Sequence, residues 1–153
     1  MPNQFISTSS RDAHVVDWLN ELFYDASMRG VSDIHFEDMA DDTRIRYRIN
    51  GKLFTETSIS RVISVDAQNK IRSRSSMPLS DVRKPLDGRF SLTYADLAID
   101  VRVSINPVIY GTSLVCRILD QRNVSRTLDD IEMEVEVRRW LNILLAEPHG
   151  LFI

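Results

Sequence analysis

Apolar and polar residues alternate with a period of two from Asp87 to Ile105, and this alternation predicts a β-hairpin with one buried face. The two arms meet at Ala95-Asp96, where a two-residue loop pairs Tyr94 with Leu97. With that pairing every apolar residue of the two arms lies on one face: Phe90, Leu92, Tyr94, Leu97, Ile99, Val101, Val103 and Ile105. A shift of one residue would turn one arm onto the wrong face, so the pattern itself predicts the register.

The predicted register puts Arg89 directly opposite Arg102 on the polar face of this hairpin. Like charges opposed across strands are destabilising, and an arginine guanidinium forms forked hydrogen bonds with phosphate or carboxylate. The pair therefore suggests an anion between the two side chains. A solvated strand face on which Asp87 and Asp100 neutralise the arginines explains the same pattern, and from the pattern alone it is the simpler interpretation.

Similar patterns predict the elements before and after this hairpin. Apolar residues at helical spacing indicate helices, and short alternating runs indicate strands. In chain order these are a helix over 11–29, a strand over 32–37, a loop over 38–42, a hairpin over 44–54 that turns at Asn50-Gly51, a helix over 64–76 and a strand over 114–119. This order predicts an α+β fold, in which a mostly antiparallel sheet carries helices on one face.

The pattern changes after Asp120. Residues 121–126 are polar like a linker, and Thr127 with Asp130 has the spacing of a helix cap. Large apolar residues then follow at helical spacing: Val135, Val137, Trp140, Leu141, Leu144 and Leu145. Residues 151–153 begin an apolar strand, so we expect a chain cut from a longer protein. The expected division is a flexible N-terminus over 1–11, a domain over 12–120, and a linker, helix and first strand of a second domain over 121–153.

Composition narrows the class of protein. The 153 residues carry a net charge of −3, and no apolar run is long enough to span a bilayer. Cys116 is the only cysteine, which excludes an internal disulfide and favours the cytoplasm. Residues 44–102 have 12 Lys or Arg against 6 Asp or Glu, and Arg outnumbers Lys by 16 to 3 in the whole chain. This excess favours forked contacts with a phosphate ligand or an acidic neighbouring subunit.

A second group of arginines, Arg44, Arg46 and Arg48, lies on one predicted strand face. Such a face could follow a nucleic-acid backbone, contact an acidic partner or keep the strand soluble, and solubility is the simplest explanation. An RNA-binding sheet would also need exposed aromatic residues on which bases stack, and these strands lack them. The three arginines are therefore a candidate partner-contact face.

The sequence predicts no metal site and no reactive cysteine. A metal ion needs three or four convergent ligands, and His14 and His149 have no spacing relation to His35 and Glu37. Cys116 falls between inward positions of a strand, which is typical of a small buried packing residue.

Five separate stretches converge on one family. In chain order they are VSDIHFED, RIRYRINGKL, KPLDGRF, IDVRVSINPVIYGTSLVCRILD and EPHGLFI. Together they resemble the type II secretion and type IV pilus assembly ATPases, in the N-terminal region directly before the Walker A motif. The resemblance covers the chain from about Ala13 onward. Three positions depart from the family pattern: Val31, Leu86 and Thr112.

The resemblance implies a PAS-like domain of a hexameric motor, followed by a linker and helix that lead into a RecA-like ATPase domain. In this family the PAS-like domain packs against the ATPase domain of its own or a neighbouring subunit, and its arginines reach the ATP phosphates. By position these look like Arg89 and Arg102, which would act as arginine fingers. The full-length protein would bind ATP and Mg²⁺, meet an inner-membrane platform protein, and work at the cytoplasmic face of the bacterial inner membrane without nucleic acid or membrane insertion.

We do not expect this chain to hydrolyse ATP alone. Its five glycines sit at predicted turns, and none belongs to a Gly-x-x-x-x-Gly-Lys phosphate-binding loop. An alternative function is a free-standing PAS-like module that binds a ligand or a protein in an inner pocket.

Overall fold

The computed structural model describes residues 8–80, 83–119 and 128–151, and the chain divides into a unit over residues 1–120 and a unit over residues 121–153. The first unit contains α1 (Thr8–Met28), β1 (Asp33–Asp38), β2 (Asp42–Ile49), β3 (Lys52–Ser60), α2 (Arg61–Arg74), β4 (Leu86–Tyr94), β5 (Leu97–Val108) and β6 (Gly111–Leu119). The second unit contains the 3₁₀ helix η2 (Leu128–Asp130) and the helix α3 (Val135–Leu145).

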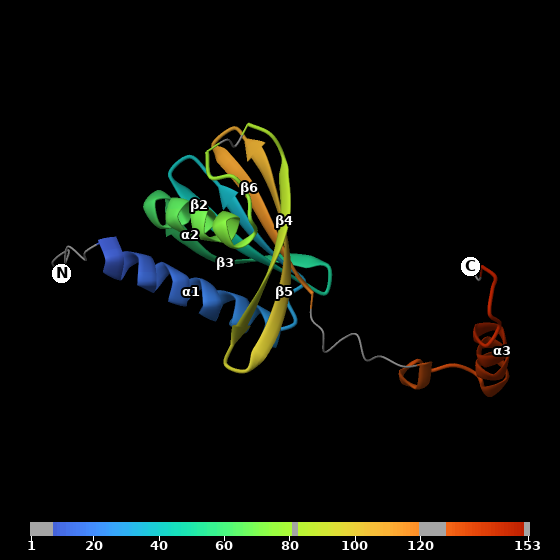
Figure 1. The fold of residues 1–153 in the computed structure, drawn as a ribbon. Coiled ribbons are helices and arrows are strands. Elements are labelled where there is room, and N and C mark those ends of the chain that lie inside the picture. The colour runs from blue at the N-terminus through green and yellow to red at the C-terminus, as the bar shows by residue number, and fades with distance from the viewer. Residues whose placement is uncertain (1–7, 81–82, 120–127, 152–153) are drawn as a thin grey trace. The chain divides into compact units, whose positions relative to one another are not determined.

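The six strands of the first unit form one sheet in the order β3-β2-β1-β6-β5-β4, and all neighbouring strands are antiparallel. The helices α1 and α2 lie side by side against one face of this sheet (Figure 1). The predicted α+β class, an antiparallel sheet with flanking helices, is therefore confirmed.

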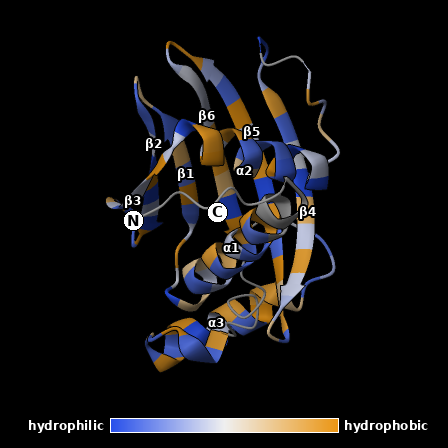
Figure 2. Cartoon of the chain, turned by 90° about the vertical axis from the view of Figure 1, so that its left-hand side faces the viewer, coloured by the Kyte–Doolittle hydropathy of each residue, from blue (hydrophilic) through white to orange (hydrophobic). Residues whose placement is uncertain are grey.

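The core lies between the sheet and the two helices. Hydrophobic and hydrophilic residues alternate along the strands (Figure 2). The buried positions of β2, β5 and β6 alternate in the same way and form one core with buried residues of α1 and α2. The largest fully buried side chains include Leu19, Phe23, Ile34, Phe36, Ile45, Tyr47, Ile71, Ile105 and Leu114. Cys116 is also fully buried and free, and burial raises the pKa of its thiol far above the ordinary value. The prediction that Cys116 is a packing residue is confirmed.

Both predicted hairpins form with the predicted turns. Asn50 and Gly51 have φ angles of 49° and 79°, and Ala95 and Asp96 have φ angles of 47° and 63°. Two consecutive positive φ angles are what a two-residue turn needs to match the twist of the flanking strands. Tyr94 pairs with Leu97, so the register predicted from the apolar pattern is confirmed.

Some boundaries differ from the predicted ones, and the local contacts explain why. The helix α2 begins at Arg61 rather than residue 64, because the Ser60 hydroxyl accepts a hydrogen bond from the backbone N–H of Ile63 and caps the helix. The predicted acidic loop over 38–42 is shorter, because β1 extends to Asp38 and β2 begins at Asp42.

Asp38 ties four elements together, which the acidic run alone did not reveal. Its carboxylate accepts hydrogen bonds from the Thr43 hydroxyl on β2 (2.7 Å), the Gln68 amide on α2 (3.0 Å) and the Thr112 backbone N–H on β6 (2.8 Å). Gly111 has a φ of 141°, a conformation that strains other residues, and a Cβ there would also clash with the Asp38 carboxylate, so glycine favours this contact. The network fixes the first half of α2 to the sheet.

Gly88 marks the place where the end of α2 approaches β4. A Cβ at this position would lie 2.7 Å from Met77 Cε and 2.8 Å from the Ser75 backbone oxygen. The Ser75 oxygen belongs to the backbone and cannot move aside as a flexible side chain can. The glycine next to Arg89 is therefore required by packing, independently of any role for the arginine.

We expect Gly88→Ala to lower the free energy of unfolding by about 1–3 kcal/mol, the usual cost of overpacking a core. Urea denaturation monitored by circular dichroism measures the change. Thr93→Ala is a suitable control, because Thr93 is an exposed residue on the same strand and exposed substitutions usually change stability by less than about 0.5 kcal/mol. Equal stability of Gly88→Ala and the wild type would contradict the close approach of α2.

Candidate functional site: an arginine row on the polar face

The face of the sheet opposite α1 and α2 is polar, and one row of charged side chains crosses five of its strands. The cross-strand register defines this arginine row, which consists of Arg48 on β2, Asp33 on β1, Arg117 on β6, Arg102 on β5 and Arg89 on β4. Each member is directly opposite the next. Four cations and one carboxylate thus lie in line along the hydrogen-bonding direction of the sheet.

Arg89 and Arg102 are opposed as predicted, and both are exposed on the polar face. Neither forms a hydrogen bond or an ion pair with another residue in the described part of the chain. Asp87 and Asp100, the carboxylates expected to neutralise them, do not pair with them, and Asp100 instead accepts a hydrogen bond from Ser91. Two adjacent guanidiniums are thus left to solvent or to a ligand.

Asp33 pairs with both arginines at the other end of the row, Arg48 and Arg117. Its side chain is buried, and it accepts a hydrogen bond from Arg117 Nε (2.9 Å) and lies 3.3 Å from Arg48 Nε. The Ser32 hydroxyl also donates to this carboxylate. Burial raises the pKa of Asp33, but the hydrogen bonds from Arg117 and Ser32 outweigh it, so the pKa lies below the ordinary value.

Shallow hollows flank Arg102 on both sides. Arg89, Ser91, Asp100 and Leu119 line one of them together with Arg102. Asp33, Asp87, Ser104 and Arg117 line the other, again with Arg102. Arg102 therefore stands between two depressions of the polar face, each with a second arginine in its wall.

The predicted partner-contact arginines lie on the same face but in a different environment. Arg46 donates to Glu37 (3.3 Å), Arg48 pairs with Asp33, and Arg44 is directly opposite Glu37. All three are half-buried. Two of them are thus held by the acids of β1, unlike Arg89 and Arg102. Their contact with a partner stays a prediction.

His35 lies between these arginines and β6. Burial lowers its pKa first, and the positive charge of Arg48 lowers it further. Its Nε2 atom is buried and has no hydrogen-bond partner among the residues that the structure describes. In the described ranges no three His, Cys, Asp or Glu side chains gather closely enough to hold a metal ion.

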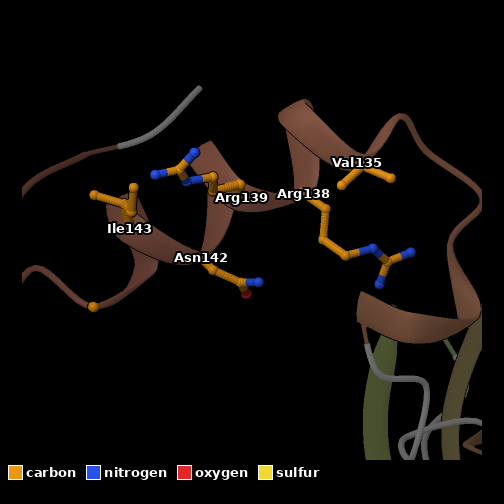
Figure 3. A pocket seen from close by; sticks show the side chains of 6 residues that line it. Val135, Arg138, Arg139, Asn142 and Ile143 are labelled. Atoms are coloured by element: carbon orange, nitrogen blue, oxygen red, sulfur yellow. The ribbon is translucent and has the colours of Figure 1, made fainter.

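A depression lies beside α3 in the second unit. Side chains of α3 line it, including Val135, Arg139, Asn142 and Ile143 (Figure 3). Arg138 also lines it, and its guanidinium donates to Asp129 and to the backbone oxygens of Leu128 and Ile131 in the preceding segment. A depression formed by a single helix encloses no ligand, so we assign no site to it.

The helix predicted from the apolar spacing after residue 130 is confirmed as α3. Thr127, half of its expected cap, lies outside the described residues, and the helix begins at Val135. Most of its large apolar side chains are exposed, with Val135 at 80% and Trp140 at 63%, whereas Leu141 is half-buried. Within the described ranges, no helix combines the length and the apolar character needed to cross a membrane.

Residues 8–153 match the family described as type II/IV secretion system protein. The chain belongs to this family. The resemblance found in the five sequence stretches is thereby confirmed.

Named relatives agree with the family match. The chain is 34% identical over 142 residues to the type II secretion system protein E of Aeromonas hydrophila, covering 93% of this chain and 28% of that protein. It is 30% identical over 143 residues to the type IV pilus assembly ATPase PilB of Acinetobacter baylyi, covering 93% of this chain and 25% of that protein. The chain thus spans less than a third of the length of these secretion relatives.

A solved structure agrees on the fold of this secretion family member. The Legionella pneumophila ATPase DotB superposes with a TM-score of 0.59 at 13% sequence identity, over 80% of this chain and 34% of that chain. At such low identity the likeness concerns the fold alone.

Sequence reasoning missed Asp33 and Arg117. Alternation did place Asp33 on the polar side of its strand, since Ile34 and Phe36 point inward. The pairing of β1 with β6 joins segments about 80 residues apart, and no local pattern predicts which residues of two such distant strands are opposite.

The Asp33 ion pair predicts a pH dependence of stability. Because the folded-state pKa is lowered, the stabilisation is complete above about pH 4, the ordinary Asp value, and is lost as the pH falls through the lowered pKa. We expect Asp33→Asn to be less stable than the wild type at pH 6 and the two to converge toward pH 2. Arg117→Gln removes the partner of Asp33, so the free energy of unfolding of this variant should also fall less between pH 6 and pH 2 than that of the wild type. Urea unfolding at a series of pH values measures this, and parallel curves would argue against the ion pair.

Proposed function

We propose that residues 12–120 form the N-terminal regulatory and subunit-contacting domain of a hexameric ATPase that powers type IV pilus assembly or type II secretion. In this proposal Arg89 and Arg102 contact the phosphates of ATP that is bound to a RecA-like ATPase domain of the same or a neighbouring subunit. The observation that carries it is the opposed, exposed pair Arg89 and Arg102, which lacks a carboxylate partner among the described residues.

The physical argument compares the free energy of the Arg89–Arg102 pair without an anion and with a phosphate chain bound between the two side chains. Without an anion the two guanidiniums repel each other across the strands. A phosphate chain between them replaces repulsion by charge-assisted hydrogen bonds, and arginine is suited to this because its fork matches the phosphate oxygens. Charge on the transferring phosphoryl group is stabilised in the same way, which is how arginine fingers accelerate hydrolysis.

The rest of the motor lies in the ATPase domain, so we do not expect this chain to hydrolyse ATP alone. Its sequence contains no Gly-x-x-x-x-Gly-Lys loop to hold the phosphates. ATP and Mg²⁺ would bind the ATPase domain, into which residues 121–153 would lead through a linker, a helix and a first strand. Arg44, Arg46 and Arg48 would serve as a second contact face toward an acidic partner.

We further propose that the full-length protein acts at the cytoplasmic face of the bacterial inner membrane, where it meets a platform protein. Several relatives are named as components of secretion systems or as pilus assembly proteins. Membership of this family favours a motor domain over a free-standing PAS-like module.

The test uses the full-length gene product, in which Arg89→Ala and Arg102→Ala should each lower the ATPase kcat by about 10³-fold, the smaller of the effects known for arginine fingers. Lys52→Ala is a suitable control, because it removes an exposed cation on β3, a strand outside the arginine row. It should leave turnover within a few-fold of the wild type. Thermal denaturation checks that all variants fold. Near-normal turnover in both Arg89→Ala and Arg102→Ala would refute the proposal.

A further inference from the structure

We propose that Arg117 is a third anion-contacting side chain of this site and that the buried carboxylate of Asp33 is the residue that positions it. The inference rests on the proposed function, because it extends the Arg89–Arg102 pair by one strand. It also specifies the ligand chemistry, which is a chain of two or more linked phosphates rather than a single phosphate.

The register places the third arginine next to the pair. Arg117 on β6 is directly opposite Arg102 on β5, just as Arg102 is directly opposite Arg89 on β4. Neighbouring strands lie about 4.8 Å apart, so the three guanidinium-bearing positions span about 10 Å in a straight line. Arg117 and Arg102 also line the same hollow of the polar face.

The contact with Asp33 leaves the binding end of Arg117 available. Arg117 donates to Asp33 through Nε. Neither of its two terminal nitrogens has a hydrogen-bond partner among the residues that the structure describes, and its side chain is 66% exposed. Asp33 thus fixes the stem of the guanidinium, while the terminal nitrogens can donate to a ligand. A long side chain that is already held in place loses less conformational entropy when a ligand binds, so binding costs less free energy.

One carboxylate does not cancel the charge of Arg117, because Asp33 is shared with Arg48. With four arginines and one aspartate, the arginine row retains an excess of three positive charges. Asp87 lines the same hollow and opposes a bound anion. Contacts from several arginines at once are therefore needed, which favours a ligand that reaches along the row over one that fits a single hollow.

The two possible roles of Asp33, tuning the net charge and positioning Arg117, predict opposite effects of Asp33→Asn on anion binding. If Asp33 only tunes the net charge, its neutralisation adds one positive charge to the row and strengthens anion binding. If Asp33 positions Arg117, its loss releases the side chain and weakens binding. The sign of the change therefore separates the two roles.

Arg48 provides a matched control for Arg117. Both arginines pair with Asp33. Arg117→Gln and Arg48→Gln therefore each remove one positive charge next to the same carboxylate. Only Arg117 is adjacent to Arg102. A general electrostatic effect weakens binding equally in both variants, whereas direct contact weakens it in Arg117→Gln alone.

The experiment is isothermal titration of the 153-residue chain with inorganic tripolyphosphate and, separately, with orthophosphate, at one low salt concentration. We expect tripolyphosphate to bind more tightly than orthophosphate. Arg117→Gln should weaken tripolyphosphate binding about tenfold or more, as expected for a lost charge-assisted hydrogen bond. Arg48→Gln should change it by less than about threefold. Asp33→Asn should weaken it despite the added positive charge.

Circular dichroism confirms that each variant folds. Should Asp33→Asn fail to fold, Arg117→Lys replaces it, because lysine keeps the charge but lacks the Nε donor, and it should also weaken binding. Equal losses in Arg117→Gln and Arg48→Gln, tighter binding by Asp33→Asn, or no tripolyphosphate binding by the wild type would each overturn the inference. The proposed function is judged separately by the ATPase activity of Arg89→Ala and Arg102→Ala, so a failure of the inference can be distinguished from a failure of the proposed function.

Discussion

Repulsion between arginines on neighbouring strands is the constraint on which the rest of this domain depends. The apolar faces of β4, β5 and β6 pack against α1 and α2, and this packing fixes the register of the sheet. Once the register is fixed, Arg89, Arg102 and Arg117 must face the same side. The core therefore supplies the stability that lets three like charges remain adjacent.

The polar face is divided into two halves by its carboxylates. On β1, Asp33 and Glu37 pair with arginines of β2, and Asp33 also pairs with Arg117. On β4 and β5 the arginines lack such partners among the described residues. In the first half carboxylates thus hold Arg46, Arg48 and Arg117, whereas Arg89 and Arg102 in the second half have no such partner among the described residues. In our proposal this asymmetry is the reason to favour a binding surface over a strand face that is merely soluble.

The packing of α2 holds the available half in shape. Asp38 anchors the first half of the helix to β2 and β6, and Gly88 lets the end of the helix approach β4. Gly88 lies on β4 directly before Arg89, so this close approach helps to place the strand that carries Arg89.

The features that were predicted from the sequence are those that depend on patterns of neighbouring residues. The two hairpins, their turns and the opposition of Arg89 and Arg102 follow from period-two alternation and from two-residue loops. Asp33, Arg117 and Asp38 were missed, because their partners lie on elements distant in the sequence. An acidic run also looks the same whether it forms a loop or ends a strand, so the burial of Asp38 became visible only in three dimensions.

A structure of the full-length motor with a non-hydrolysable ATP analogue tests the central claim most directly. We expect guanidinium nitrogens of Arg89 and Arg102 to lie about 2.7–2.9 Å from phosphate oxygens, the range for charge-assisted hydrogen bonds. Phosphates held entirely by the ATPase domain, with both arginines directed to solvent or to acidic side chains of another subunit, would contradict it.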